Sequence, residues 1–401
     1  MTIPFKRLLL LFIVLAVLPG FQHLKAGDNP APADSSGLFT HARIFSYYQW
    51  GRVLQTNDFV RGKNLVHDPI DDYRALSVHL LKQTTGQKTW QKVYNYPSFG
   101  AGVYAVRFPG TPELGKPFAV YGLFTAPFKR WQNLSFDYNL GFGFTMNWES
   151  FEVSHNSYNI ALGAEQSVYI DLGLEMNYRL QNGLCLGVGG SFTHFSNGAL
   201  KKPNYGINIA GPRIKLGYDF NDQLPQTGWN EVPPYTKRNE YLVSFFTGTK
   251  NVLYDGPGVD SVTMFKGVYY PVYGISLGYN RQVSYKSKLG FGMAFDYFGA
   301  ANSSITLQNG NLEDHDASLR DGFEISVFPS YELVIDRLSL ILQYGFFLHR
   351  QSYEGLTPST YQRIGIKYHV FKNIFAGLNL HAYNNYISDY IEWNIGYRLV
   401  K

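Results

Sequence analysis

The run "VYIDLGLEMNYRL", from Val168 to Leu180, alternates apolar and polar residues over its whole length. Its even-numbered positions are apolar: Val168, Ile170, Leu172, Leu174, Met176, Tyr178 and Leu180. Its odd-numbered positions include four polar or charged residues: Asp171, Glu175, Asn177 and Arg179. A period of two residues predicts a β-strand with one apolar and one polar face.

The same alternation recurs along the chain to its C-terminus. It is clearest in residues 133–147, 289–298, 337–347, 363–370 and 390–400. A tilted strand needs about 9–11 residues to cross a bilayer, and these segments are of that order. We count about 16 such segments, or 14 if the weaker patterns near Ala42 and Val268 are left out.

The composition narrows the class of protein. Of the 401 residues only 16% are charged, whereas 17% are aromatic and 40 are Gly. The mean hydropathy is −0.18, far below that of a helical membrane protein. A soluble β-sandwich would carry more charge on its exposed faces than these strands do. We therefore expect an all-β fold, a transmembrane antiparallel β-barrel of about 14–16 strands.

The N-terminus has the features of a secretory signal peptide. Lys6 and Arg7 precede an apolar run from Leu8 to Leu18, and "HLKAG" offers a cleavage site after Ala26. The run is too short to span a bilayer as a retained helix. We expect residues 1–26 to be the signal peptide and residues 27–38 a polar linker. The single cysteine, Cys185, cannot form an internal disulfide, and a net charge of +5 is too small to indicate nucleic acid binding.

The connections between the predicted strands differ in length on the two sides. Those within "LQNGL", "VIDRL" and "VFKNI" are tight, whereas residues 146–164 and 299–320 form long loops. Short periplasmic turns and long external loops are typical of outer-membrane barrels. Residues 221–239 break this rule, because they are long and Pro-rich yet on the short-turn side. They are either a loop of one barrel or a linker between two smaller ones; we favour one barrel, built from residues 39–220 and 240–401.

Polar side chains occupy the end of the apolar face of one predicted strand. In the segment from Leu184 to Ser196 the even positions face lipid, and His194 and Ser196 continue that face. By the same parity Asn208 faces outward from the next strand. One reading is a wet rim where these groups meet lipid headgroups. The other is a catalytic site, with Ser196 as nucleophile, His194 as base and Asn208 orienting the imidazole. Asn197 and the Gly198 backbone are then the expected oxyanion donors.

The stretch "HFSNGALKKPNYGIN", residues 194–208, resembles the signature of outer-membrane lipid A 3-O-deacylases of the PagL type, also called acyloxyacyl hydrolases. In that family His-x-Ser-Asn is followed by Pro-Asn-x-Gly-x-Glu, and His, Ser and Glu form the triad. The resemblance implies that His194 and Ser196 are base and nucleophile and that Asn197 lies near the oxyanion hole. It places the triad carboxylate at Asn208, an amide here, and it spans roughly Phe39 to Phe220.

The resemblance implies an outer-membrane ester hydrolase that removes an acyl chain from lipid A of lipopolysaccharide in the outer leaflet. Lys201 and Lys202 are either part of a solvated loop or a site for a lipid phosphate. The ten His show no metal-ligand spacing, so we expect neither a metal nor another cofactor. The alternative is a non-enzymatic outer-membrane barrel, a porin or structural protein, that retains the signature.

Overall fold

The computed structural model describes residues 41–220, 232–254, 256–309, 311–351, 358–384 and 387–401. The predicted signal peptide and polar linker lie outside the described residues, as do residues 221–231 of the long Pro-rich connection.

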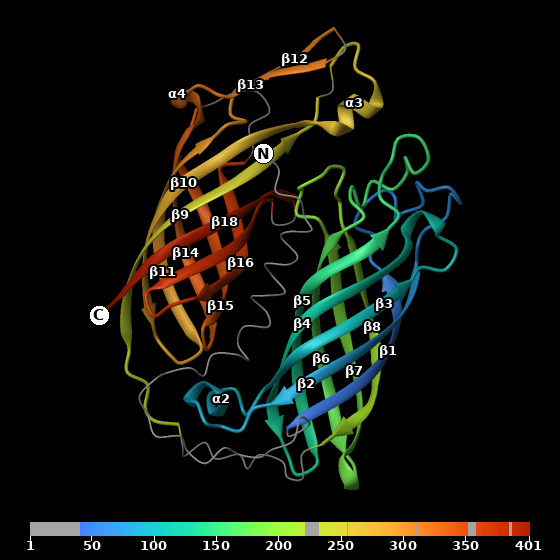
Figure 1. Ribbon diagram of the computed structural model, residues 1–401, viewed down its shortest axis with the longest axis vertical. Coiled ribbons are helices and arrows are strands. Elements are labelled where there is room, and N and C mark those ends of the chain that lie inside the picture. Colours follow the sequence, from blue (N-terminus) through green and yellow to red (C-terminus); the bar gives the residue numbers. More distant parts are fainter. Residues whose placement is uncertain (1–40, 221–231, 255, 310, 352–357, 385–386) are drawn as a thin grey trace.

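The chain folds into two closed antiparallel barrels of eight strands each, which stand side by side in Figure 1. The first barrel consists of β1 (Ala42–Val53), β2 (Asp72–Gln83), β3 (Ser98–Arg107), β4 (Gly115–Arg130), β5 (Leu134–Trp148), β6 (Ser167–Arg179), β7 (Leu184–Ser196) and β8 (Ile207–Asp219). The second consists of β9 (Arg238–Val252), β10 (Val268–Gln282), β11 (Ser287–Phe298), β14 (Phe323–Ile335), β15 (Leu338–His349), β16 (Thr360–His369), β17 (Ile374–Tyr383) and β18 (Ile387–Val400).

The all-β barrel class expected from the sequence is confirmed, but the single closure that we favoured is wrong. β1 pairs with β8, with Arg43 opposite Asp219 and Val53 opposite Ile209, so the first barrel closes before the Pro-rich connection begins. β9 pairs with β18 and closes the second barrel. One large barrel and two small ones present the same alternation along each strand, because only the pairing of the edge strands differs between them.

The smaller elements lie in the connections. They are α2 (Thr89–Val93), η2 (Pro112–Leu114), η3 (Gln181–Gly183), α3 (Ser261–Lys266), α4 (Leu319–Gly322) and the hairpin of β12 (Ser304–Gln308) and β13 (Asn311–His315). Among the described residues no helix has the length and apolar character to cross a membrane. The connections predicted to be tight, such as η3 between β6 and β7, share one end of their barrel, here called the short-turn end; the opposite one is the long-loop end.

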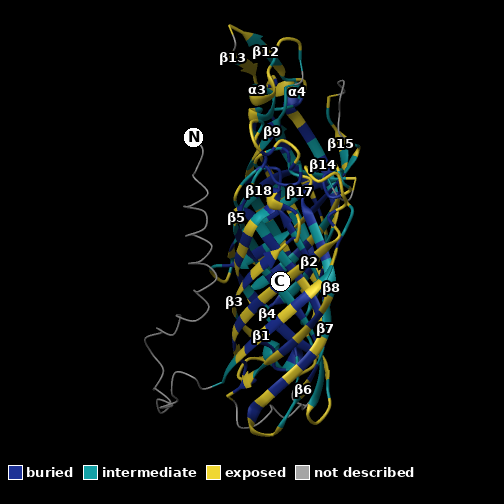
Figure 2. Cartoon of the chain, turned by 90° about the vertical axis from the view of Figure 1, so that its right-hand side faces the viewer, coloured by how far each residue is buried: buried dark blue, intermediate teal, exposed yellow. Residues whose placement is uncertain are grey.

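The strand faces follow the predicted parity. On β7 the outward Leu184, Leu186 and Val188 are 41%, 44% and 61% exposed, whereas the inward Thr193 and Phe195 are fully buried. Figure 2 shows exposed and buried residues alternating along the strands of the molecule. The outward faces thus form an apolar surface suited to lipid.

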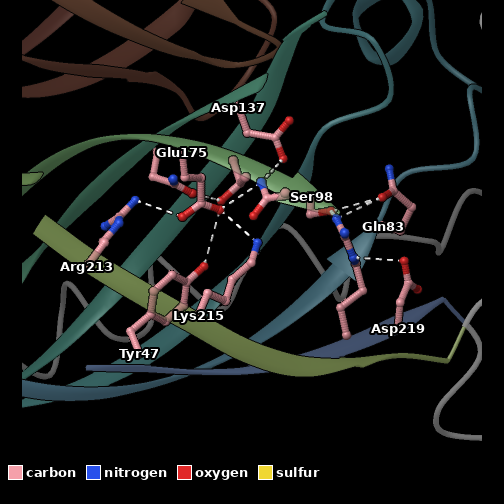
Figure 3. A network of polar contacts seen from close by, with 12 residues as sticks. Tyr47, Gln83, Ser98, Asp137, Glu175, Arg213, Lys215 and Asp219 are labelled. Carbon is pink, nitrogen blue, oxygen red and sulfur yellow. Dashed lines mark hydrogen bonds and ion pairs between the residues drawn. The ribbon is translucent and has the colours of Figure 1, made fainter. Parts of the chain in front are cut away.

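A network of ion pairs lies in the interior of the first barrel, as Figure 3 shows. Glu175 accepts hydrogen bonds from Lys215 Nζ at 2.8 Å and from Arg213 Nη2 at 3.1 Å. Asn177 Nδ2 donates to the same carboxylate at 3.1 Å, and Arg213 also reaches Asp171 at 3.4 Å. All of these side chains are buried. Each buried charge therefore has a partner of opposite sign, which is the condition for burying it without a prohibitive desolvation cost.

The second barrel has a similar arrangement around Glu332. This carboxylate pairs with Lys367 and, at 3.6 Å, with Lys288, while Asn280 Nδ2 donates to it at 2.7 Å. Lys288 also donates to Glu240 at 2.8 Å. Eight strands enclose an interior just wide enough for side chains to fill. In the part of the chain that the structure describes, both interiors combine buried ion pairs with packed apolar and aromatic side chains.

The barrels touch near both ends. At the short-turn end Tyr94, just after α2, donates from its hydroxyl to the Val334 carbonyl of the second barrel at 2.7 Å. Lys286 lies over the same ring, 4.5 Å from its centroid, and burial lowers the pKa of this ammonium. At the long-loop end the rings of Phe151 and Phe265 are 4.4 Å apart.

Candidate active site

The hairpin of β7 and β8 carries the three residues expected to act together. His194 and Ser196 lie at the long-loop end of β7, and Asn208 is the second residue of β8. His194 and Asn208 are direct cross-strand partners, so both project from the outer surface of the barrel. Ser196 follows His194 on the same face, because side chains two residues apart on a strand share a face.

A short chain of hydrogen bonds orients the imidazole. His194 Nδ1 lies 2.6 Å from Asn208 Oδ1. Asn208 Nδ2 donates to Thr56 Oγ1 at 3.2 Å, and Thr56 Oγ1 in turn donates to the Leu54 carbonyl at 3.4 Å. Because the amide nitrogen is used for Thr56, its oxygen faces the ring and accepts from Nδ1–H. That tautomer leaves the lone pair on Nε2, where a general base needs it.

The hydroxyl of Ser196 is held by the loop that follows it. Its Oγ accepts from the Gly198 backbone N–H at 3.1 Å and from Asn204 Nδ2 at 3.5 Å. Among the described residues, the Ser196 hydroxyl is therefore hydrogen-bonded to this loop and not to the His194 imidazole. His194 and Ser196 nevertheless converge on one point: a Cβ on Gly206 would lie 3.1 Å from His194 Cε1 and 3.5 Å from Ser196 Cβ. Only a glycine leaves this space open, and its φ of +71° suits glycine as well.

Asn204 was missed as a site residue by the sequence reasoning. Its Nδ2 approaches Ser196 Oγ, and its Oδ1 accepts from the Asn197 backbone N–H at 2.9 Å. Asn197 also donates from its side chain to the Lys201 carbonyl at 2.8 Å, so both of its donors are engaged inside the loop. The signal for Asn204 was its place in the Pro-Asn-x-Gly part of the motif, but only the fold of the loop brings it to the hydroxyl.

Lys201 and Lys202 are not held against the Ser196 hydroxyl as Gly198 and Asn204 are. The Lys201 side chain is exposed, while Lys202 is partly buried next to the second barrel. Burial lowers the pKa of the Lys202 ammonium, and the nearby Lys250 lowers it further, whereas Asp389 raises it. Lys250 and Asp389 form an ion pair inside the second barrel.

The outer face around the serine is covered. Ser196 is only 6% exposed although it points outward, and Phe144 on the same outer face is also 6% exposed. Farther from the long-loop end, the outward Leu172 and Leu174 of β6 are 48% and 49% exposed. The site is therefore covered by protein, whereas the rest of the outer face of these strands is open, and burial strengthens the hydrogen bonds there. Across the described residues, no group of three or more His, Cys, Asp or Glu side chains is placed to hold a metal ion.

Two family models match the chain, one for each barrel. Residues 75–223 match the model of lipid A 3-O-deacylase (PagL), and residues 239–401 match that of the acyloxyacyl hydrolase C-terminal domain. The first barrel is thus similar to lipid A 3-O-deacylases (PagL), and the second to the C-terminal domain of acyloxyacyl hydrolases. Comparison with curated protein sequences finds no match.

Several solved structures match the chain at low sequence identity. The crystal structure of the outer membrane enzyme PagL has 17% identity over 43% of this chain and 97% of its own, with a TM-score of 0.29. The toluene transporter TodX of P. putida has 9% identity over 90% of this chain and 88% of its own, with a TM-score of 0.17. OccAB1 of Acinetobacter baumannii has 10% identity over 90% and 97%, with a TM-score of 0.23. All three TM-scores are below 0.5, so the assignment rests on the family models.

The match to the PagL family model, together with two barrels whose outward faces are apolar, identifies an outer-membrane β-barrel protein. The coarse activity that the family implies is ester hydrolysis.

Proposed function

We propose that the protein removes an ester-linked acyl chain from lipid A of lipopolysaccharide, with Ser196 as the nucleophile on the outer surface of the first barrel. The observation that carries this proposal is the 2.6 Å contact between His194 Nδ1 and Asn208 Oδ1. This contact supports a fixed orientation of the imidazole, with Nε2 as the basic nitrogen, on the same outward strand face as Ser196.

The reaction proceeds in two acyl-transfer steps. Ser196 Oγ turns from the loop toward His194, loses its proton to Nε2 and forms a bond to the ester carbonyl carbon. The negative oxygen of the tetrahedral intermediate accepts from the Gly198 N–H, which already points at the hydroxyl. His194 then gives its proton to the leaving sugar oxygen as the ester bond breaks, which releases a sugar hydroxyl. Water, deprotonated by His194, attacks the acyl-enzyme and releases the fatty acid and the serine.

The amide at position 208 supplies orientation without charge. A carboxylate would hold the same tautomer and also stabilise the imidazolium that forms during the reaction. Asn208 performs the first task because Thr56 holds its amide in the required orientation. We therefore expect a working but slower triad than one with Glu at this position.

The barrel interiors disfavour the porin alternative. Glu175, Arg213 and Lys215 are at most 5% exposed in the first barrel. Glu332, Lys288 and Lys367 are at most 3% exposed in the second. A water-filled pore would leave such lumen side chains hydrated.

Mass spectrometry of lipid A from cells with and without the protein tests the proposal. The protein should remove one acyl chain, and Ser196→Ala should abolish this while the chain still assembles in the outer membrane. Ser157→Ala is the matched control, because Ser157 ends the other His-x-Ser of the first barrel, in the β5–β6 loop, and is exposed. Equal lipid A profiles for wild type and Ser196→Ala would remove the enzymatic assignment.

A further inference from the structure

The second barrel lies directly against the loop that carries the oxyanion donor. A Cβ placed on Gly198 would be 2.6 Å from Ile391 Cδ1 and 3.7 Å from Leu380 Cδ1. Ile391 belongs to β18 and Leu380 to β17, and the two are cross-strand partners. Gly198 therefore lies between the Ser196 hydroxyl, to which its N–H donates, and the apolar side chains of the second barrel.

Further contacts hold the two barrels together around this loop. Tyr269 of β10 donates from its hydroxyl to the Leu200 carbonyl at 3.2 Å. Lys202 is close enough to the Lys250–Asp389 pair for both charges to act on its ammonium. Ile391 is only 8% exposed, whereas Ile395, four residues along the same outward stripe, is 57% exposed. Along this stripe the outer face of the second barrel is thus covered where it meets the loop from Asn197 to Gly206, here called the site loop, and open farther along.

The position of this apolar contact limits where an acyl chain can go. An ester carbonyl attacked by Ser196 must direct its oxygen toward the Gly198 N–H. Its acyl chain then starts within a few bond lengths of Gly198, on the outer surface of the first barrel. An alkyl chain gains free energy by burying its methylene groups against apolar side chains, so the nearby Ile391 and Leu380 are available as a wall.

We infer that the second barrel is part of the active site: Ile391 and Leu380 form one wall of the acyl-chain site and determine which chain length is cleaved. This inference rests on the proposed function. In it, the first barrel supplies the catalytic groups and the second barrel supplies chain-length specificity, so the two barrels act as one enzyme.

Substitutions of opposite size at Ile391 test this. The full-length protein is given an equal mixture of lipid A species that differ only in the length of the ester-linked chain, and products are quantified by mass spectrometry. Ile391→Trp should shift the preference toward short chains and Ile391→Ala toward long ones, each by about tenfold in the ratio of long-chain to short-chain cleavage. The matched controls, Ile395→Trp and Ile395→Ala, should keep the wild-type ratio.

Folding of each variant is checked by the heat-dependent shift of barrel mobility on gels, and Leu380→Ala replaces any variant that fails this check. A wild-type ratio in both Ile391 variants would overturn the inference, as would an equal loss of rate for every chain length. Either result leaves the proposed function intact, provided that Ser196→Ala is inactive. Unchanged deacylation in Ser196→Ala would instead remove the proposed function.

Discussion

The two barrels have the same number of strands and a similar interior, but their outer surfaces differ. Each interior holds a buried glutamate between two cations and an asparagine, centred on Glu175 in one and Glu332 in the other. On the outside, the last hairpin of the first barrel pairs His194 with Asn208, whereas that of the second pairs Leu380 with Ile391. Similar interiors thus stabilise each barrel, whereas the outer face near the long-loop end carries the proposed catalytic groups in the first barrel and apolar side chains in the second.

The largest expected effect is the loss of the base. His194→Ala should lower deacylation about a thousandfold or more, since a positioned general base contributes on the order of 10²–10⁴ in rate. His155→Ala, in the second His-x-Ser of the first barrel, should leave the rate unchanged. Initial rates of fatty acid release measure both. Full activity in His194→Ala would show that the catalytic site lies outside this hairpin. The outer faces of the two barrels would then not differ in the way proposed.

Removal of the central carboxylates should destabilise both barrels without changing the chemistry. Glu175→Gln removes the carboxylate that Lys215 pairs with, and Glu332→Gln the one that Lys367 pairs with, each at a cost of about 3–5 kcal/mol. Both should lower the temperature at which gel mobility changes. At a temperature where the variants are folded, deacylation should match wild type, because neither carboxylate reaches the outer surface. A lower rate in the folded Glu332→Gln protein would contradict the division between interior and surface.

Replacement of the amide should have an intermediate effect. Asn208→Leu removes the acceptor that selects the imidazole tautomer, and we expect a loss of about tenfold to a hundredfold in kcat, by analogy with the role of the third triad member. Asn208→Glu should retain or raise the rate, because a carboxylate also stabilises the imidazolium. Steady-state kinetics at neutral pH compare them. Wild-type kcat in Asn208→Leu would show that another group orients the ring.

The smallest effect should come from two tyrosine hydroxyls that join the barrels. Tyr269→Phe loses a bond to the site loop, and Tyr94→Phe loses one at the opposite end. Each bond contributes about 1 kcal/mol. Only Tyr269→Phe should lower the deacylation rate, by a few-fold, while both should lower the stability of the paired barrels to a similar extent. An equal rate loss in both variants would mean that the site senses barrel packing in general.

Much of the site was predictable because strand parity is a local property. The alternation around Leu184 and Ile214 predicted that His194, Ser196 and Asn208 share the outer face, and the register places His194 opposite Asn208. Asn204 was not predictable in the same way. It lies in a loop without periodicity, and its distance from Ser196 Oγ depends on how that loop turns back over the strand end.

The barrel class followed from the sequence alone, because a period of two residues and a low charge content act within each strand, whatever it pairs with. The number of barrels was decided only in the tertiary structure, since closure depends on whether β1 meets β8 or a more distant edge. The contact of Gly198 with Ile391 is likewise decided only in the tertiary structure. Two segments this far apart in sequence meet because two finished barrels pack together, and no local pattern encodes which outward stripes face each other.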